Sequence, residues 1–148
     1  MVVIILIAIF LVGCGGNGNS LPDFSGQYGG GQIFLGSNGP GGPWIEIGPT
    51  TVQANGSFES IIRFYPPGEP LRDGHMQGVI SRQGFVNARS LLSGGGYLEI
   101  CGGPLKKVYG RAGPGWIVTG TVSVSHYWSE GSSQTYVVYP NSTMMIWP

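Results

Sequence analysis

Apolar and polar residues alternate along most of the chain, in short runs that glycine and proline interrupt. The clearest run spans residues 118–128, where valine, glycine, histidine and tryptophan occupy the even positions and threonine, serine and tyrosine the odd ones. A period of two residues predicts a β-strand with one buried face. Beyond residue 14 no segment keeps a 3.6-residue apolar period over two turns, so we expect no helix there.

The same alternation predicts a series of short strands, many of them bounded by glycine, proline or asparagine. These strands are expected at residues 27–35, 44–47, 51–54, 57–64, 75–81, 85–92, 97–101, 106–109, 116–128, 135–139 and 143–147. They predict an all-β fold, either a small up-and-down antiparallel β-barrel of about eight or more strands or a two-sheet β-sandwich. We favour the barrel, because successive hairpins follow one another along the chain and closure removes exposed strand edges.

Two tight turns can be placed from the sequence. Asn55-Gly56 lies between alternating segments, which is the strongest short signal for a β-hairpin. Gly84 occupies the equivalent place 84 − 56 = 28 residues later, which suggests a strand–turn–strand unit used twice. The segment Gly113-Pro-Gly115 is a candidate for a third copy.

The chain begins with a continuous apolar run, from Met1 to Val12, that stops at Gly13-Cys14. Twelve helical residues reach about 18 Å, well short of the ~30 Å hydrocarbon core of a bilayer. The run instead matches the apolar segment of an export signal, which small residues follow. A buried core element that happens to end in Gly-Cys is the alternative interpretation.

The residues Leu11-Val12-Gly13-Cys14 resemble the lipobox of bacterial lipoprotein signal peptides. The resemblance implies cleavage before Cys14, attachment of diacylglycerol to its thiol and acylation of the new amino terminus, for example with palmitate. Two or more acyl chains form a stable membrane anchor, since each buried CH₂ contributes about 0.8 kcal/mol. The protein is then expected in the bacterial cell envelope, and Gly15, which is not aspartate, implies the outer membrane.

The chain divides accordingly into a signal peptide at 1–13, the lipidated cysteine with a flexible tether at 14–23, and a single β-rich domain at 24–148. The glycine-rich tether spans about 15 Å on average. The formal net charge is zero, with seven basic and seven acidic residues. A protein that binds nucleic acid requires a basic face, so we expect no nucleic-acid partner. We expect contact with the membrane through the lipid on Cys14.

Motifs for metal and catalytic chemistry are absent from the sequence. It contains two histidines and two cysteines, without His-x-His, Cys-x-x-Cys or clustered acidic ligands, so we expect no metal ion and no cofactor. There is no nucleophile elbow, Ser-x-x-Lys or phosphate-binding loop, and we therefore expect no enzyme. Cys101 ends the alternating segment 97–101, where we expect a buried, inert thiol.

Two groups of residues are candidates for contact with a ligand or partner. His126 and Trp128 share the predicted inner face of 118–128, where His126 would be either a core histidine or a group that contacts a ligand or acts as a base. The polar loop at 66–75 carries the second group, which is Arg72, Asp73 and His75. Loops often carry function, although proline and charge also keep a long hairpin loop soluble and stiff.

These observations favour a non-catalytic β-domain that binds a ligand or partner in the cell envelope. An envelope protein, a glycan or a small apolar ligand would suit a surface with few charges and many aromatic residues. One alternative is a structural or assembly lipoprotein, in which the domain serves as a spacer or scaffold. The other is an enzyme that uses His126 or the loop with His75 as a base.

Overall fold

The computed structural model describes residues 23–38, 41–109, 116–130 and 132–148, so the predicted signal peptide, lipobox and tether lie outside it, apart from residue 23. Its strands are β1 (Gly26–Tyr28), β2 (Gly30–Phe34), β3 (Trp44–Ile47), β4 (Thr50–Val52), β5 (Ser57–Tyr65), β6 (Arg72–Ile80), β7 (Val86–Leu92), β8 (Tyr97–Gly102), β9 (Lys106–Tyr109), β10 (Trp116–Glu130) and β11 (Ser133–Trp147), and a 3-10 turn, η1 (Gly36–Asn38), follows β2. No helix in these ranges has the length and apolar character needed to cross a membrane.

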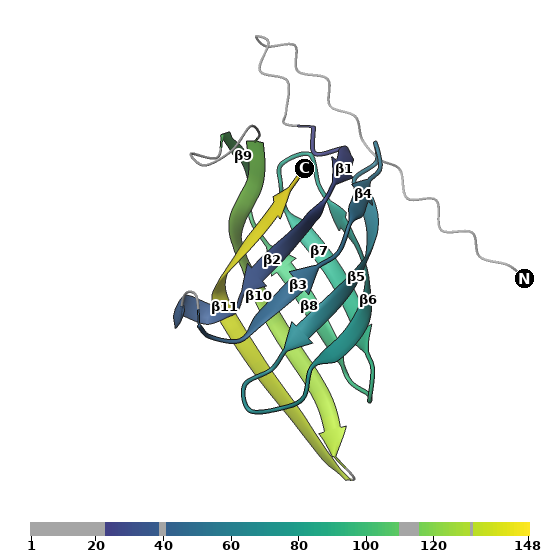
Figure 1. Ribbon diagram of the computed structural model, residues 1–148, viewed down its shortest axis with the longest axis vertical. Coiled ribbons are helices and arrows are strands. Elements are labelled where there is room, and N and C mark those ends of the chain that lie inside the picture. Colours follow the sequence, from purple (N-terminus) through teal and green to yellow (C-terminus); the bar gives the residue numbers. More distant parts are fainter. Residues whose placement is uncertain (1–22, 39–40, 110–115, 131) are drawn as a thin grey trace, which may run out of the picture.

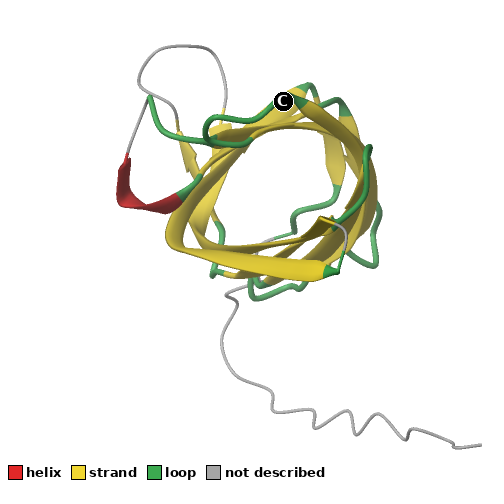
Figure 2. Cartoon of the chain, turned by 90° about the horizontal axis from the view of Figure 1, so that it is seen from below, coloured by secondary structure: helices red, strands yellow, loops and turns green. Residues whose placement is uncertain are grey.

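Eight of the strands form a closed antiparallel barrel. The order around the ring is β2-β3-β5-β6-β7-β8-β10-β11, and pairing of β11 with β2 completes it (Figures 1 and 2). Neighbours in the ring follow one another along the chain, apart from the short strands β1 and β4, which extend the sheet beside β5, and β9, which pairs with β10. The predicted all-β fold and the up-and-down barrel are therefore confirmed, and the sandwich is excluded.

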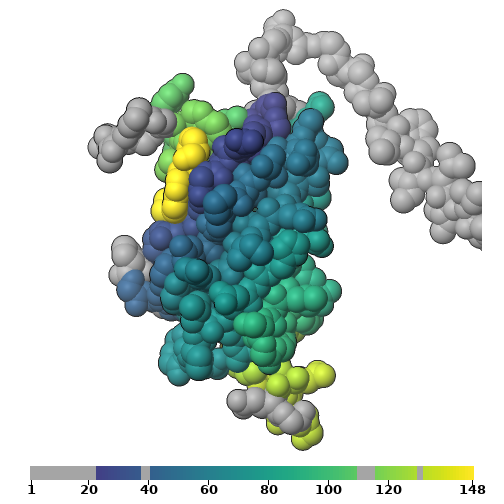
Figure 3. Space-filling view, turned by 45° about the vertical axis from the view of Figure 1, so that its right-hand side comes forward, coloured from purple at the N-terminus to yellow at the C-terminus, as the bar shows by residue number. Residues whose placement is uncertain are grey.

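The two ends of the barrel differ in what they carry. We call the end with the β5–β6 loop, the β7–β8 turn and the β10–β11 hairpin the lower end, as drawn in Figure 1. The β10–β11 hairpin projects beyond the rest of the barrel there (Figures 1 and 3). The upper end holds β1, β4, β9 and the carboxyl terminus, and the described chain also enters there, just before β1 (Figure 1).

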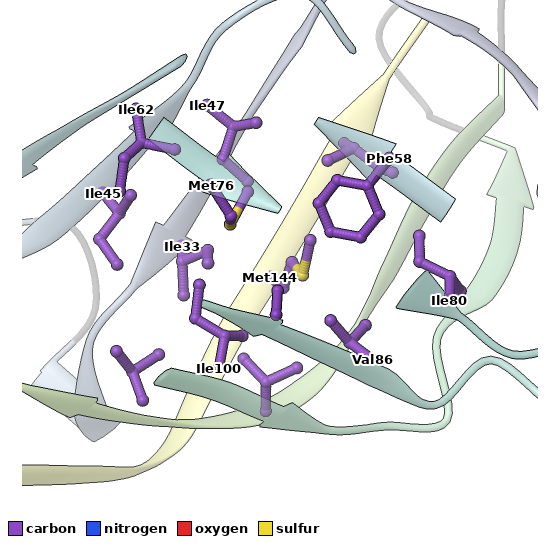
Figure 4. Close-up of a cluster of buried hydrophobic side chains, with 14 of the residues drawn as sticks. Ile33, Ile45, Ile47, Phe58, Ile62, Met76, Ile80, Val86, Ile100 and Met144 are labelled. Atoms are coloured by element: carbon purple, nitrogen blue, oxygen red, sulfur yellow. The ribbon is translucent and has the colours of Figure 1, made fainter. Parts of the chain in front are cut away.

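The interior of the barrel is filled by apolar side chains. Strict alternation along each strand directs every second residue inward, and Ile33, Ile100 and Met144, on three different strands, are at most 2% exposed. Figure 4 shows how isoleucine, valine, methionine and phenylalanine side chains from facing strands meet in the centre. A core of this kind stabilises the barrel by removing apolar surface from water.

The two predicted turns have the same geometry. Gly56 has a φ of 85° and its N–H donates to the carbonyl of Gln53 at 2.8 Å, while Gly84 has a φ of 91° and its N–H donates to the carbonyl of Ser81 at 2.9 Å. The carbonyl of each glycine then accepts a hydrogen bond from a distant strand or loop residue, Ile80 or Leu105. The repeated unit is therefore confirmed for two copies, whereas 113–115 lies outside the described residues.

Replacing Gly56 or Gly84 with alanine is expected to lower the free energy of unfolding by about 2 kcal/mol, because a Cβ there combines backbone strain with displacement of a neighbouring carbonyl. Gly68 is the matched control, since its φ is 70° but a Cβ would meet nothing within 4 Å. Gly68→Ala should cost about 1 kcal/mol. Urea unfolding of the three variants measures the difference, and equal losses would contradict the contact argument.

The carboxyl-terminal strand differs from the sequence prediction. The predicted strands 135–139 and 143–147 are parts of one strand, β11, interrupted by a bulge at Pro140-Asn141, where Asn141 has a φ of 57°. The pairing with β10 jumps from Val122↔Ser142 to Val124↔Tyr139 at this point. The extra residues reverse which positions face inward, so odd positions point into the barrel below the bulge and even positions above it.

Cys101 is exposed, so the expected buried thiol was wrong. Leu98 and Ile100 occupy the inner face of β8, with 0% and 1% exposure. Because side chains alternate along a strand, Cys101 must point outward. The position of Cys101 thus follows from the alternation of side chains along β8 and not from the general tendency of cysteine to be buried.

Candidate functional site

The predicted loop at 66–75 is shorter than expected, because Arg72, Asp73 and His75 already belong to strand β6. Asp73 and His75 point outward, where Asp73 Oδ1 lies 3.8 Å from Arg63 Nε and His75 Nε2 lies 3.6 Å from Glu59 Oε2. Pairs that are this exposed contribute about 1 kcal/mol or less. Asp73 and His75 are therefore separated from Arg72 by the wall of the barrel.

Arg72 points toward the lower opening of the barrel. Its side chain is 21% exposed and donates hydrogen bonds to Glu69 Oε2 at 3.1 Å and to the carbonyl of Gly95 at 3.2 Å. Glu69 belongs to the β5–β6 loop and Gly95 to the β7–β8 turn. The guanidinium group thus ties together two loops that cover the lower end.

His126 lies inside the barrel, as the alternation of 118–128 predicts. It is 2% exposed. Its ring packs edge-to-face against Phe64, with 4.8 Å between ring centroids, and stacks on Trp128 at 4.3 Å. The predicted proximity of His126 and Trp128 is therefore confirmed, and three aromatic rings close the lower end of the core.

One nitrogen of the His126 imidazole forms no hydrogen bond to the described residues. Among the described residues, Nε2 of His126 is a buried side-chain nitrogen without a hydrogen-bond partner. The buried hydroxyl groups behave differently, because each donates to a backbone carbonyl; they belong to Thr50, Ser60, Ser90 and Ser142. Leaving a buried polar atom unpaired costs roughly 1–3 kcal/mol, so this position does not contribute its full potential stability.

Burial is the main cause that lowers the pKa of His126 to about 4; the positive charge of Arg72 acts in the same direction and Glu69 in the opposite one. Burial also raises the pKa of Tyr139, with a smaller contribution from Glu69. The charges of Arg72 and Glu69 act on His126, and the charge of Glu69 also acts on Tyr139. We call these four residues, together with Trp128, the lower-end cluster. His126 is neutral near pH 7, and an aromatic environment without a hydrogen-bonded nucleophile favours a packing role over that of a general base.

A second feature of the lower end lies on the outer surface, where three tyrosines form a row. Tyr97 of β8, Tyr127 of β10 and Tyr136 of β11 are direct cross-strand neighbours. The ring centroids are 4.5 Å apart between Tyr97 and Tyr127 and 4.4 Å apart between Tyr127 and Tyr136. Arg89 covers the free face of Tyr97, with Cζ 3.9 Å from the ring centroid, so the tyrosine row begins with a cation–π contact.

The hydroxyl groups of the tyrosine row are also linked. A hydrogen bond with Tyr136 is the main cause that raises the pKa of Tyr127 to about 12. The phenol of Tyr127 therefore remains protonated near neutral pH. Tyr136 is 54% exposed, which leaves the last ring of the row open to solvent.

A pocket of about 280 Å³ lies beside this row, where the hairpin projects past the start of β8. We call it the hairpin pocket; its lining residues are Gly96, Tyr97, Tyr127, Trp128, Ser129, Gln134 and Thr135. Gly96 has a φ of 83°, and a Cβ there would lie 3.0 Å from Cβ of Trp128. Glycine thus permits the close approach of the β7–β8 turn to the hairpin. Of the predicted site residues, only Trp128 lines this pocket.

Within the described ranges, no three histidine, cysteine, aspartate or glutamate side chains come together in a way that would hold a metal ion. No family model, curated protein or solved structure matches the chain. A β-barrel by itself is compatible with many functions, so function has to be inferred from the chemistry of the site.

Proposed function

We propose that the protein is a membrane-anchored bacterial lipoprotein whose barrel binds a ligand or partner of the cell envelope, without catalysing a reaction. The observation that carries the binding part is the hairpin pocket, whose lining residues include the aromatic Tyr97, Tyr127 and Trp128 and the polar Ser129 and Gln134. Aromatic surface with a few polar groups at its rim is typical of recognition sites.

The size and position of the pocket limit what it can take. Its volume of about 280 Å³ is at the small end of ligand sites, for which roughly 300–1,000 Å³ is usual. It therefore suits one ring-sized group, such as a sugar unit of a glycan or one side chain of a protein partner. The barrel interior is packed with apolar side chains, which supports a binding site on the outside of the lower end over one inside the barrel.

The chemistry around His126 supports binding over catalysis. Its imidazole faces Phe64 and Trp128 and has a strongly lowered pKa. A general base needs a hydrogen bond, direct or through one water, to the group whose proton it removes. The alternative base, His75, lies on the outer surface beside Glu59 and away from the hairpin pocket.

Removal of the side chain of Tyr127, which lines the hairpin pocket, is expected to weaken binding. The full chain is purified under mild conditions from its source membrane, and native mass spectrometry detects copurified ligands or partners. Tyr127→Ala should reduce their recovery at least about tenfold, because a central aromatic anchor often contributes 2 kcal/mol or more. Ile61→Ala is the matched control, since Ile61 is 61% exposed on the outer face of β5 and does not line the pocket. Equal recovery with both variants, or no bound molecule with the wild type, contradicts the binding proposal.

The anchor has its own test. Cys14→Ser is expected to move the protein from the membrane fraction to the soluble fraction, because serine cannot form the thioether to diacylglycerol. Cys101→Ser is the control and should remain membrane-bound. Membrane retention and normal processing of the Cys14→Ser variant would exclude the lipid anchor.

A further inference from the structure

The lower half of β11 is paired on one side only. From Ser133 to Tyr139 it pairs with β10, whereas β2 pairs with β11 only between Thr143 and Trp147. Within the described ranges, no strand lies along the other side of Ser133–Tyr139. Backbone N–H and C=O groups of alternate residues on this side are therefore available to another strand.

This free edge lacks the features that normally prevent strands from pairing between molecules. Natural sheets protect their edges with lysine, proline or inward-pointing charge. The sequence from Ser133 to the end of the chain contains no charged residue, and Pro140 lies beyond the free segment, at the bulge. Valine and tyrosine make up four of the seven residues from Ser133 to Tyr139, and both favour extended structure. The edge is thus suited to accept a neutral extended strand.

The tyrosine row indicates which strand fits best. Tyr136 is the last ring of the row and lies on the strand with the free edge. We infer that two copies of the protein pair through this edge, with their β11 strands antiparallel and Tyr136 opposite the partner's Tyr136. The segment Ser133–Tyr139 has seven residues, and Tyr136 is the central one. The antiparallel pair is therefore self-complementary about a two-fold axis through Tyr136.

Side-chain chemistry on both faces agrees with this register. On the outer face, Gln134 lies opposite the partner's Val138, and the two tyrosine rows join into one continuous row across the axis. Directly opposite side chains in antiparallel strands have Cβ atoms about 4.5–5.5 Å apart, close to the ring spacing already present in the row. On the inner face, Thr135 lies opposite the partner's Val137. No like charges meet anywhere along the pair.

Disulfide trapping tests the register directly. The full chain with Cys14→Ser and Cys101→Ser serves as background, and Tyr136→Cys places one thiol at the two-fold axis. The expected Cα separation suits a disulfide, so mild oxidation should give a covalent dimer. Ile61→Cys is the control, because Ile61 is 61% exposed but lies on β5, which is paired on both sides. Absence of a dimer with Tyr136→Cys, or equal dimer yields for the two variants, overturns the inference.

Sedimentation of variants without new thiols gives an independent measurement. Tyr136→Lys places two ammonium groups opposite each other and should raise the dimer dissociation constant at least about tenfold. Ile61→Lys adds the same charge to the outer face of β5, away from the tyrosine row, and should leave the dissociation constant unchanged. Circular dichroism establishes that both variants are folded. A wild-type chain that sediments as a monomer at every concentration contradicts self-pairing, whether or not the hairpin pocket binds a ligand.

Discussion

Replacing Ile100 with alanine is expected to lower the free energy of unfolding by about 2–5 kcal/mol. Ile100 is 1% exposed in the middle of β8, and its direct cross-strand neighbours are Ala88 and Val124, which are both buried. A short neighbour such as Ala88 cannot fill the space that the isoleucine leaves. The variant therefore loses transfer free energy and also retains a cavity. Urea unfolding followed by circular dichroism measures the change.

Cys101→Ala is the matched control for this experiment. Cys101 follows Ile100 directly but is exposed, so its replacement should change stability by less than about 0.5 kcal/mol. The two adjacent substitutions thus report on the inner and outer faces of one strand. Similar losses for both would contradict the inward and outward assignment of β8.

Acidification is expected to destabilise the wild-type protein through His126. Its pKa is lowered from 6.5 to about 4 in the folded state. Between these two values the unfolded chain binds more protons than the folded chain, so stability falls as the pH falls from about 6.5 to about 4. The resulting loss in the free energy of unfolding is about 3 kcal/mol. This loss is absent above pH 6.5 and complete below about pH 4.

The substitution His126→Leu should remove this part of the pH dependence. Leucine has a similar volume and no polar atom, so near pH 7 the loss of stacking on Trp128 is offset by removal of the unpaired nitrogen. The stability of the variant at pH 4 should therefore exceed that of the wild type. His75→Gln is the control, since His75 is exposed and its replacement should leave the profile between pH 6.5 and 4 nearly unchanged. A His126→Leu variant that keeps the wild-type profile would contradict burial of His126.

The barrel could be predicted from the sequence because its strands and turns are specified by short, local patterns of residues. Alternation from Val118 to Trp128 identified the inner face of β10, and the glycines at 56 and 84 identified two turns. A one-sided alternation also decides the position of Cys101, which was misjudged because a residue preference was given more weight than the period of its strand. Local pattern was therefore sufficient wherever side chains alternate without interruption.

The candidate site could not be predicted, because it depends on cross-strand register. Tyr97, Tyr127 and Tyr136 belong to three strands, and nothing in the sequence shows that they are direct neighbours. Arg72 and His126 come near each other only after the barrel has closed. The bulge at Pro140-Asn141 shifts the inward face of β11, and a period of two alone cannot reveal such a shift. The sequence did indicate that Tyr127 points outward, because it occupies an odd position of the alternating segment 118–128.

The proposed lipid anchor has a geometric consequence, because the described chain enters the barrel at its upper end. If Cys14 carries the lipid, the bilayer is expected on the side of β1, at the upper end of the barrel (Figure 1). The residues that line the hairpin pocket lie at the opposite end, at the start of β8 and in the β10–β11 hairpin. A nine-residue strand such as β6 is about 30 Å long and, when tilted, spans roughly 20 Å of barrel height. The pocket and the free edge of β11 would then face away from the lipid surface, where large molecules can approach without competing with the bilayer.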